Sequence, residues 1–183
     1  MILASSLALG ACSGEDYGKT VEQGRAVAFG GGKVTFVKDV NVNPKKGPSY
    51  ENSIRTFSLP KDPKEIGPEP KVGCLIDFNV DKKQVQIYKD NELKTVAIET
   101  VNVQTNIESH NAAVKGKTFP MVNKDKNEVT IYGKKTLLTF KVPSSLPVED
   151  AFWTMGDNVR VFSTKEGEAR RFMNISKTNI FKK

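Results

Sequence analysis

Cys12 is the residue whose surroundings most clearly indicate a chemical reaction. The uncharged, apolar stretch from Met1 to Ala11 precedes it, and the polar segment SGEDYGK follows it. Leu9-Gly10-Ala11-Cys12 has the form of a bacterial lipobox, where small residues admit a signal peptidase and the cysteine thiol takes up a diacylglyceryl group as a thioether. A secretory leader needs a short apolar core and small residues before the cleavage site, which are present, and a positively charged start, which is absent. The sequence therefore predicts a signal peptide over residues 1–11 and lipidation at Cys12. The alternative is a cysteine buried at the end of an N-terminal strand or helix.

Lipidation at Cys12 predicts where the chain is located. The mature chain is expected on a membrane of the cell envelope, and Ser13 in the next position predicts the outer membrane, with the body facing the periplasm. With Cys12 acylated, Cys74 has no partner for a disulfide within the chain. Cys74 lies in the apolar pattern KVGCLIDF, which predicts a small hydrophobic residue on a strand. The alternative, a reactive or metal-binding thiol, lacks a nearby His or second Cys.

The sequence offers few groupings of side chains that suggest catalysis, which needs convergent groups. His110 is the only histidine and lies in the linking segment ESHNAAVKGK, where a solvated side chain is expected. The segments DFNVDKKQ and VNKDKNEV contain closely spaced Asp and Asn. They fit hairpin turns and lack the central glycine and terminal glutamate of a calcium-binding loop. The sequence predicts no catalytic residue, no metal site and no cofactor.

The excess positive charge is confined to the C-terminal part of the chain. Residues 12–110 carry 14 Lys and Arg against 14 Asp and Glu, whereas residues 111–183 carry 14 against 7, which accounts for the whole net charge of +7. Exposed basic groups attract anionic polymers, lipid headgroups or acidic proteins. The alternative is a solvated surface that only keeps the chain soluble. Nucleic acid is not an expected partner for an exported chain. The lysines expected to contact an anionic partner are Lys134, Lys135, Lys177 and Lys182.

Trp153 and Arg160 are the other residues expected to bind a ligand. Trp153, together with Phe152, is suited to stack on a sugar or a lipid headgroup, and the alternative is a core residue that closes the end of a barrel. In GDNVRVF, alternation places Val159 and Val161 toward the core and directs Arg160 outward or to the opposite layer. The same alternation places the adjacent Arg170 and Arg171 on opposite faces of a strand, so they are not expected to form one patch.

Short alternating runs must form the elements that position these residues. GRAVAF, KVTFVKD, RTFSLP, CLIDFNV, QVQIYKD and KTVAIETVNV alternate apolar and polar residues and are separated by Gly, Pro, Asn and Asp, a pattern typical of strands. No window of helical length has a sustained 3.6-residue period. The polar segment SGEDYGKTVEQ predicts a lipid-anchored tether over residues 12–23. The sequence therefore predicts an all-β body that begins near Gly24.

The C-terminal part repeats the order of motifs of the N-terminal part. GRAVAF corresponds to GKTFPM, KVTFV to EVTIY, and TFSLP to TFKVP. The interval from Phe57 to Gly73 equals the interval from Phe140 to Gly156, at 16 residues each. These correspondences favour an internal duplication. The alternative is that two unrelated antiparallel domains share turn residues and alternation.

The duplication predicts the domain organisation. Each copy has about five strands, too few for a two-layered sandwich, and such a unit commonly closes into a small barrel. We therefore expect two tandem five-stranded barrels, OB-like or SH3-like, over residues 24–110 and 111–183. Ile76 and Val159 are expected at equivalent core positions.

Three segments of the chain resemble a known family. They are GPEPKVG, VKGKTFP and the terminal RFMN-x-[ST]-KT-x-IFKK. Over nearly the whole mature chain, the sequence resembles a family of lipoproteins of unknown function from sulfate-reducing bacteria. The resemblance implies export, a lipid anchor and a β-rich body. It implies no activity and no catalytic residue.

The sequence leaves two functions open. The first is a non-catalytic envelope lipoprotein that binds a protein or an anionic polymer of the envelope. The alternative is an enzyme or sensor that acts on an envelope glycan or metabolite in a cleft between the two β-domains. Asp77, Asp81, Trp153 and Arg160 in one cleft would favour the alternative, and their dispersal would favour the first.

Overall fold

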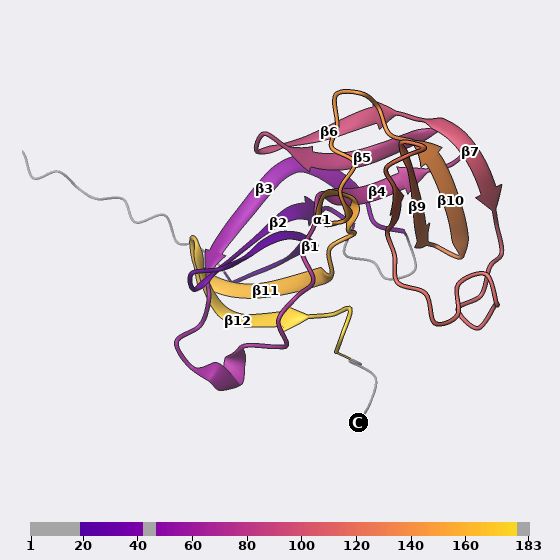
Figure 1. The fold of residues 1–183 in the computed structure, drawn as a ribbon. Coiled ribbons are helices and arrows are strands. Elements are labelled where there is room, and N and C mark those ends of the chain that lie inside the picture. Colours follow the sequence, from indigo (N-terminus) through magenta and orange to yellow (C-terminus); the bar gives the residue numbers. More distant parts are fainter. Residues whose placement is uncertain (1–18, 42–46, 179–183) are drawn as a thin grey trace, which may run out of the picture.

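The described part of the chain is built almost entirely from strands. The computed structural model describes residues 19–41 and 47–178, and Figure 1 shows its ribbon. The predicted signal peptide, Cys12 and Lys182 lie outside the described residues. The prediction of an all-β body is confirmed. In chain order the elements are β1 (Thr20–Gly30), β2 (Lys33–Asp39), β3 (Tyr50–Ser58), the 3-10 turn η1 (Pro63–Glu65), β4 (Leu75–Asn79), β5 (Gln84–Lys89), β6 (Glu92–Ala97), β7 (Glu99–Gln104), β8 (Met121–Asn123), β9 (Glu128–Gly133), β10 (Thr136–Lys141), the one-turn helix α1 (Asp150–Trp153), β11 (Asn158–Lys165) and β12 (Glu168–Asn174).

Helices play little part in the fold. Within residues 19–41 and 47–178, none has the length and apolar composition that crossing a membrane requires.

Five strands form a sheet that closes on itself, which we call the barrel. Its strand order is β1-β11-β12-β3-β2. Neighbouring strands are antiparallel except β12 and β3, which are parallel and are joined by the pair Glu168–Ser58. Along β11, Val159, Val161 and Ser163 are buried, as the alternation of side chains predicts. The buried hydrophobic residues of the barrel are Ala26, Val34, Phe36, Phe57, Val159, Val161, Ala169 and Phe172.

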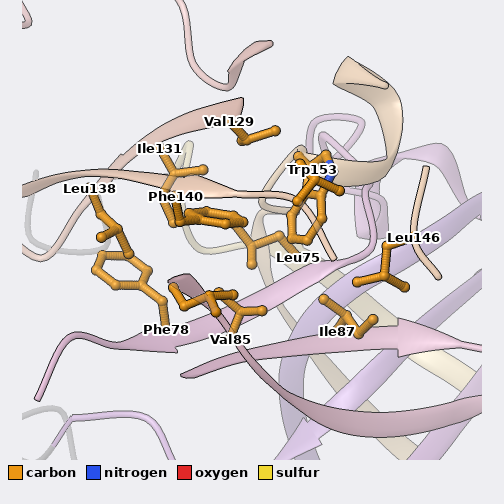
Figure 2. Close-up of a cluster of buried hydrophobic side chains, with 12 residues drawn as sticks. Leu75, Phe78, Val85, Ile87, Val129, Ile131, Leu138, Phe140, Leu146 and Trp153 are labelled. Carbon is orange, nitrogen blue, oxygen red and sulfur yellow. The ribbon is translucent and has the colours of Figure 1, made fainter. Parts of the chain in front are cut away.

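Two further sheets share a second hydrophobic core. Their strand orders are β7-β10-β9-β8 and β4-β5-β6, and Figure 1 shows them beside the barrel. Figure 2 shows side chains of both sheets meeting in this second core. Because each sheet supplies fully buried side chains to the same core, the two sheets form one packed unit. The contributors include Leu75, Phe78, Val85 and Ile87 from one sheet and Val129, Ile131, Leu138 and Phe140 from the other.

This topology differs from the two predicted tandem barrels. β1 precedes the predicted division between residues 110 and 111, and β11 follows it, yet the two strands pair from Thr20–Ser163 to Arg25–Asn158. The second core likewise combines β4 and β5 with β9 and β10. Each packed unit therefore takes strands from both sides of the division. The physical reason is that a strand edge pairs with whichever edge completes its hydrophobic core, near or far in sequence.

Each part of the chain nevertheless begins with the same local order of elements, which β6 and β7 follow in the first part only. A three-strand meander, a short helical segment and a hairpin occur as β1-β2-β3, η1 and β4-β5, and again as β8-β9-β10, α1 and β11-β12. In both parts the hairpin packs with strands of the other part. The hairpin β11-β12 completes the barrel, and the hairpin β4-β5 packs against β9 and β10. The two parts are therefore interlocked, and the internal duplication itself is not confirmed.

Candidate functional site

Asp77, Asp81, Trp153 and Arg160 are not gathered in one cleft. Asp77 lies on β4, where its carboxylate contacts Lys134 Nζ at 2.5 Å, and Asp81 is exposed in the turn after β4. Arg160 lies on β11 and donates from Nη2 and Nε to a glutamine side chain of β1, at 2.8 and 3.2 Å. Trp153 belongs to the second core. These four residues therefore do not build the common site that the enzyme or sensor hypothesis requires.

Trp153 is a core residue. Its side chain is fully buried, and its Nε1 donates to Pro147 O at 2.8 Å. The ring packs edge-on against Phe140 and Phe152, with centroid distances of 5.1 and 5.2 Å, and Figure 2 shows it next to Phe140. Because the side chain has no solvent-exposed area, it offers no surface platform for a sugar, and its position is that of a core residue, the alternative that the sequence left open.

The lysines expected to bind an anionic partner are engaged with carboxylates of the chain itself. The ion pairs, at 2.5, 2.6 and 3.8 Å, are Lys134–Asp77, Lys135–Glu108 and Lys177–Asp157. Lys182 lies outside the described residues. A lysine that is already paired with a carboxylate contributes little positive potential to an approaching anion. If the excess positive charge of residues 111–183 binds a partner, other basic residues must make the contacts.

Cys74 and His110 do not form a reactive site. Burial raises the pKa of the Cys74 thiol, so less of it is the nucleophilic thiolate at neutral pH than for an exposed cysteine. His110 is exposed. In the part of the chain that the structure describes, no group of three or more His, Cys, Asp and Glu side chains is placed to hold a metal ion.

A β-bulge in β12 brings two arginines to the same surface. Phe162 of β11 pairs with Arg171, but the next residue, Ser163, pairs with Ala169, so Arg170 is an extra residue in the ladder. An extra residue interrupts the alternation of side chains between the two faces of a strand. Arg170 and Arg171 are both exposed and line the same cavity. The prediction that these adjacent arginines form no common patch is therefore wrong.

We call this cavity the arginine groove. It has a volume of about 530 Å³ and lies between the hairpin β11-β12 and the segment that contains η1. Phe162 is half-buried and provides an apolar surface, and the exposed cationic side chains surround it. The lining residues are Pro60, Lys61, Asp62, Glu65, Phe162, Ala169, Arg170 and Arg171.

The acidic side chains of the arginine groove are already engaged. Glu65 Oε2 lies 3.4 Å from Arg171 Nε, and Asp62 Oδ1 accepts a hydrogen bond at 2.9 Å from the backbone of η1, which it caps. Among the described residues, Arg170 and Lys61 form no ion pair with a carboxylate. The groove therefore has positive charge available to a ligand. A guanidinium group offers a planar set of N–H donors that matches the oxygens of a carboxylate, sulfate or phosphate.

The sequence signal for this groove is weak. Adjacent arginines are visible in EARRFMN, but the bulge that aligns them depends on how β12 pairs with β11.

Comparison with known proteins yields a family and no characterised relative. A family described as a domain of unknown function (DUF4881) matches residues 16–183. The match spans the barrel, the second core and the arginine groove. No curated protein and no solved structure matches the chain.

Proposed function

Because the chain belongs to the DUF4881 family, whose function is unknown, we propose a function from the geometry of this chain. It is a non-catalytic binding module of the bacterial cell envelope, anchored by a lipid on Cys12, that binds an anionic polymer in the arginine groove. The observation that carries the proposal is the bulge at Arg170, which places two arginines and Lys61 around one apolar side chain.

The chemistry of the arginine groove suits an acidic glycan. Arg170 and Lys61, which form no ion pair among the described residues, supply donors for carboxylate or sulfate groups, and Arg171 adds the N–H groups that it does not direct at Glu65. Phe162 supplies an apolar surface for the face of a sugar ring. Phe162 pairs with Val21 of β1, whose side chain is 54% exposed, so apolar surface continues beyond the groove. A polymer longer than one sugar unit can therefore extend from the groove onto the apolar surface at Val21.

The distance to the lipid anchor favours a ligand near the membrane surface. β1 begins at Thr20, which pairs with Ser163, next to Phe162 of the groove. Cys12 lies eight residues before Thr20, and eight residues span at most about 30 Å when fully extended. A lipid on Cys12 would therefore hold the groove within about 30 Å of the membrane surface, where it can meet anionic polymers of the envelope on that side.

Binding to a charged polymer tests the groove directly. The full chain carrying Cys12→Ser is passed over immobilised dextran sulfate, with uncharged dextran as the reference polymer. Retention on dextran sulfate only is expected. The retention should weaken as the salt concentration rises, because the Debye length falls from about 10 Å at 0.1 M to about 3 Å at 1 M.

Two variants of equal charge locate the binding surface. Arg170→Gln with Arg171→Gln should abolish retention, whereas Lys124→Gln with Lys126→Gln, two exposed lysines of the β8-β9 turn, should leave it nearly unchanged. Equal losses in both variants would show that only net charge matters, and retention of the arginine variant would refute the groove. Selective capture of an acidic protein with no retention on dextran sulfate would favour the protein partner instead.

The lipid anchor is tested separately. Expression in a Gram-negative host with labelled palmitate should label the wild-type chain and leave Cys12→Ser unlabelled. Labelling of both chains, or of neither, would refute lipidation at Cys12 while leaving the groove experiment intact.

A further inference from the structure

A second cavity lies where the barrel meets the second core. It has a volume of about 330 Å³ and shares no lining residue with the arginine groove. Arg25 of β1 and Gly156, just before β11, contribute the barrel side of its wall. Ile131 of β9 and Phe119, in the segment before β8, contribute the opposite side. We call it the junction cavity.

Arg25 places a buried positive charge in the wall of the junction cavity. Its side chain is only 9% exposed. Nε donates to Ile76 O at 3.1 Å, Nη1 donates to Gly156 O at 2.9 Å, and the guanidinium lies 5.6 Å from the ring centre of Tyr50. These contacts fix the position of the guanidinium, but none of them supplies a negative charge. Among the described residues, no carboxylate forms an ion pair with Arg25.

Lys71 adds a second positive charge at the same cavity. Its Nζ donates one hydrogen bond, at 3.2 Å, to Phe119 O, and an ammonium group has three donors. Two N–H groups of Lys71 therefore remain for a ligand. The side chain is exposed, so it lies at the side of the cavity that solvent reaches.

Among the described residues, one carboxylate lines the junction cavity, and it is occupied by other donors. Asp157 Oδ2 accepts hydrogen bonds from Lys71 N and Asn174 Nδ2, both at 2.9 Å, and lies 3.8 Å from Lys177 Nζ. The lining thus has two cations and one already engaged anion. A single negative charge on a ligand would balance the excess, which a buried cation such as Arg25 otherwise leaves uncompensated.

Apolar side chains form part of the remaining wall of the junction cavity. Leu75, Phe119, Ile131 and Met155 line it, beside the polar side chains of Tyr132 and Ser176. A ligand that fills this space therefore needs a hydrocarbon part as well as a charged group. Sites for small molecules commonly combine apolar walls with a few fixed polar groups in this way.

We propose that the junction cavity binds a small organic monoanion, a carboxylate on a short apolar body, with the carboxylate near Arg25 and Lys71 and the apolar body against Ile131 and Phe119. This inference does not depend on the proposed function, because the cavity and the arginine groove are separate. Since its walls belong to both packed units, a ligand in the cavity links the barrel to the second core.

Two probes of the same size test the charge requirement. Hexanoate has the expected carboxylate and apolar body, and hexanamide is its uncharged counterpart. Each is titrated into the full chain carrying Cys12→Ser. Trp153, the only tryptophan, contributes to the cavity wall, so its fluorescence reports binding, and amide NMR shifts at Tyr132 and Gly156 report the location. We expect hexanoate to bind saturably and hexanamide to bind with about tenfold lower affinity. The difference is what losing a hydrogen bond to a charged group should cost.

Variants then assign the response to the cavity. Lys71→Gln should weaken hexanoate binding several-fold, and Lys64→Gln, at another exposed lysine, on η1, should not change it. Arg25→Met should abolish binding; if that variant does not fold, the comparison of Lys71 with Lys64 decides alone. Equal affinity for both probes, no saturable response to either, or equal effects of the two lysine variants would each overturn the proposal.

Discussion

Lys134 and Lys135 show, at the scale of single residues, how charged side chains can serve the fold instead of a ligand. They form the turn between β9 and β10 with positive φ angles of 50° and 56°, a conformation that costs a non-glycine residue roughly 1 kcal/mol or more. Both side chains then reach other segments: Lys134 contacts Asp77 and lies 5.5 Å from the centre of the Phe78 ring, and Lys135 contacts Glu108. These lysines hold the hairpin tip against its neighbours.

The two ion pairs of this turn differ in burial and should differ in their effect on stability. Asp77 is 14% exposed, with Oδ1 buried and lacking any well-directed hydrogen bond, whereas Glu108 is 50% exposed. Lys134→Met should lower the free energy of unfolding by about 1–3 kcal/mol, because it leaves the Asp77 carboxylate without its partner. Lys135→Met should have little effect. Urea unfolding of both variants measures this, and equal losses would contradict the role assigned to Asp77.

At the scale of elements, Gly156 allows β1 and the segment before β11 to approach closely. A Cβ atom on Gly156 would lie 2.0 Å from Ala26 O. At this contact Ala26 N donates to Asp157 O at 2.9 Å, and Arg25 Nη1 donates to Gly156 O at 2.9 Å. The backbone of β1 therefore lies where any side chain at position 156 would have to be.

Adding a methyl group at Gly156 should separate these elements. Gly156→Ala is expected to lower the free energy of unfolding by about 1–3 kcal/mol, the usual cost of forcing extra atoms into a packed site. Gly47→Ala is the matched control, because a Cβ atom there meets nothing within 4 Å. Thermal and urea unfolding of the two variants give the comparison. An unchanged stability of Gly156→Ala would mean that β1 does not approach this segment so closely.

At the scale of the whole molecule, the exchange of hairpins determines what can fold alone. The barrel needs β1, β2 and β3 from the N-terminal part and β11 and β12 from the C-terminal part. The second core needs β4 and β5 from the first part and β9 and β10 from the second. Neither part has a complete core of its own, and a chain segment without a buried core cannot offset the conformational entropy lost on folding.

Cutting the chain at the predicted division should therefore unfold both parts. Residues 12–110 and residues 111–183, made separately, are expected to give poorly dispersed NMR spectra and no cooperative thermal transition. Mixing them in equal amounts should restore strand structure by circular dichroism, because all the strands of both cores are then present. Cooperative unfolding of either part alone would show that it holds an independent core and would contradict the interlocked arrangement.

The sequence by itself determined the features that depend on neighbouring residues. Alternation over two positions predicted strands and directed Val159 and Val161 to a core, and Gly, Asn and Asp marked the turns. Ile76 and Val159 are both buried, as expected, although they belong to different cores. Only the tertiary structure decided the features that depend on partners distant in sequence. These are the pairing of β1 with β11, the bulge that aligns Arg170 with Arg171, and the burial of Trp153. The physical reason is that alternation fixes which face of a strand is apolar, while the choice of partner strand, the position of an extra residue and the pairing of charges follow from which edges complete a core in three dimensions.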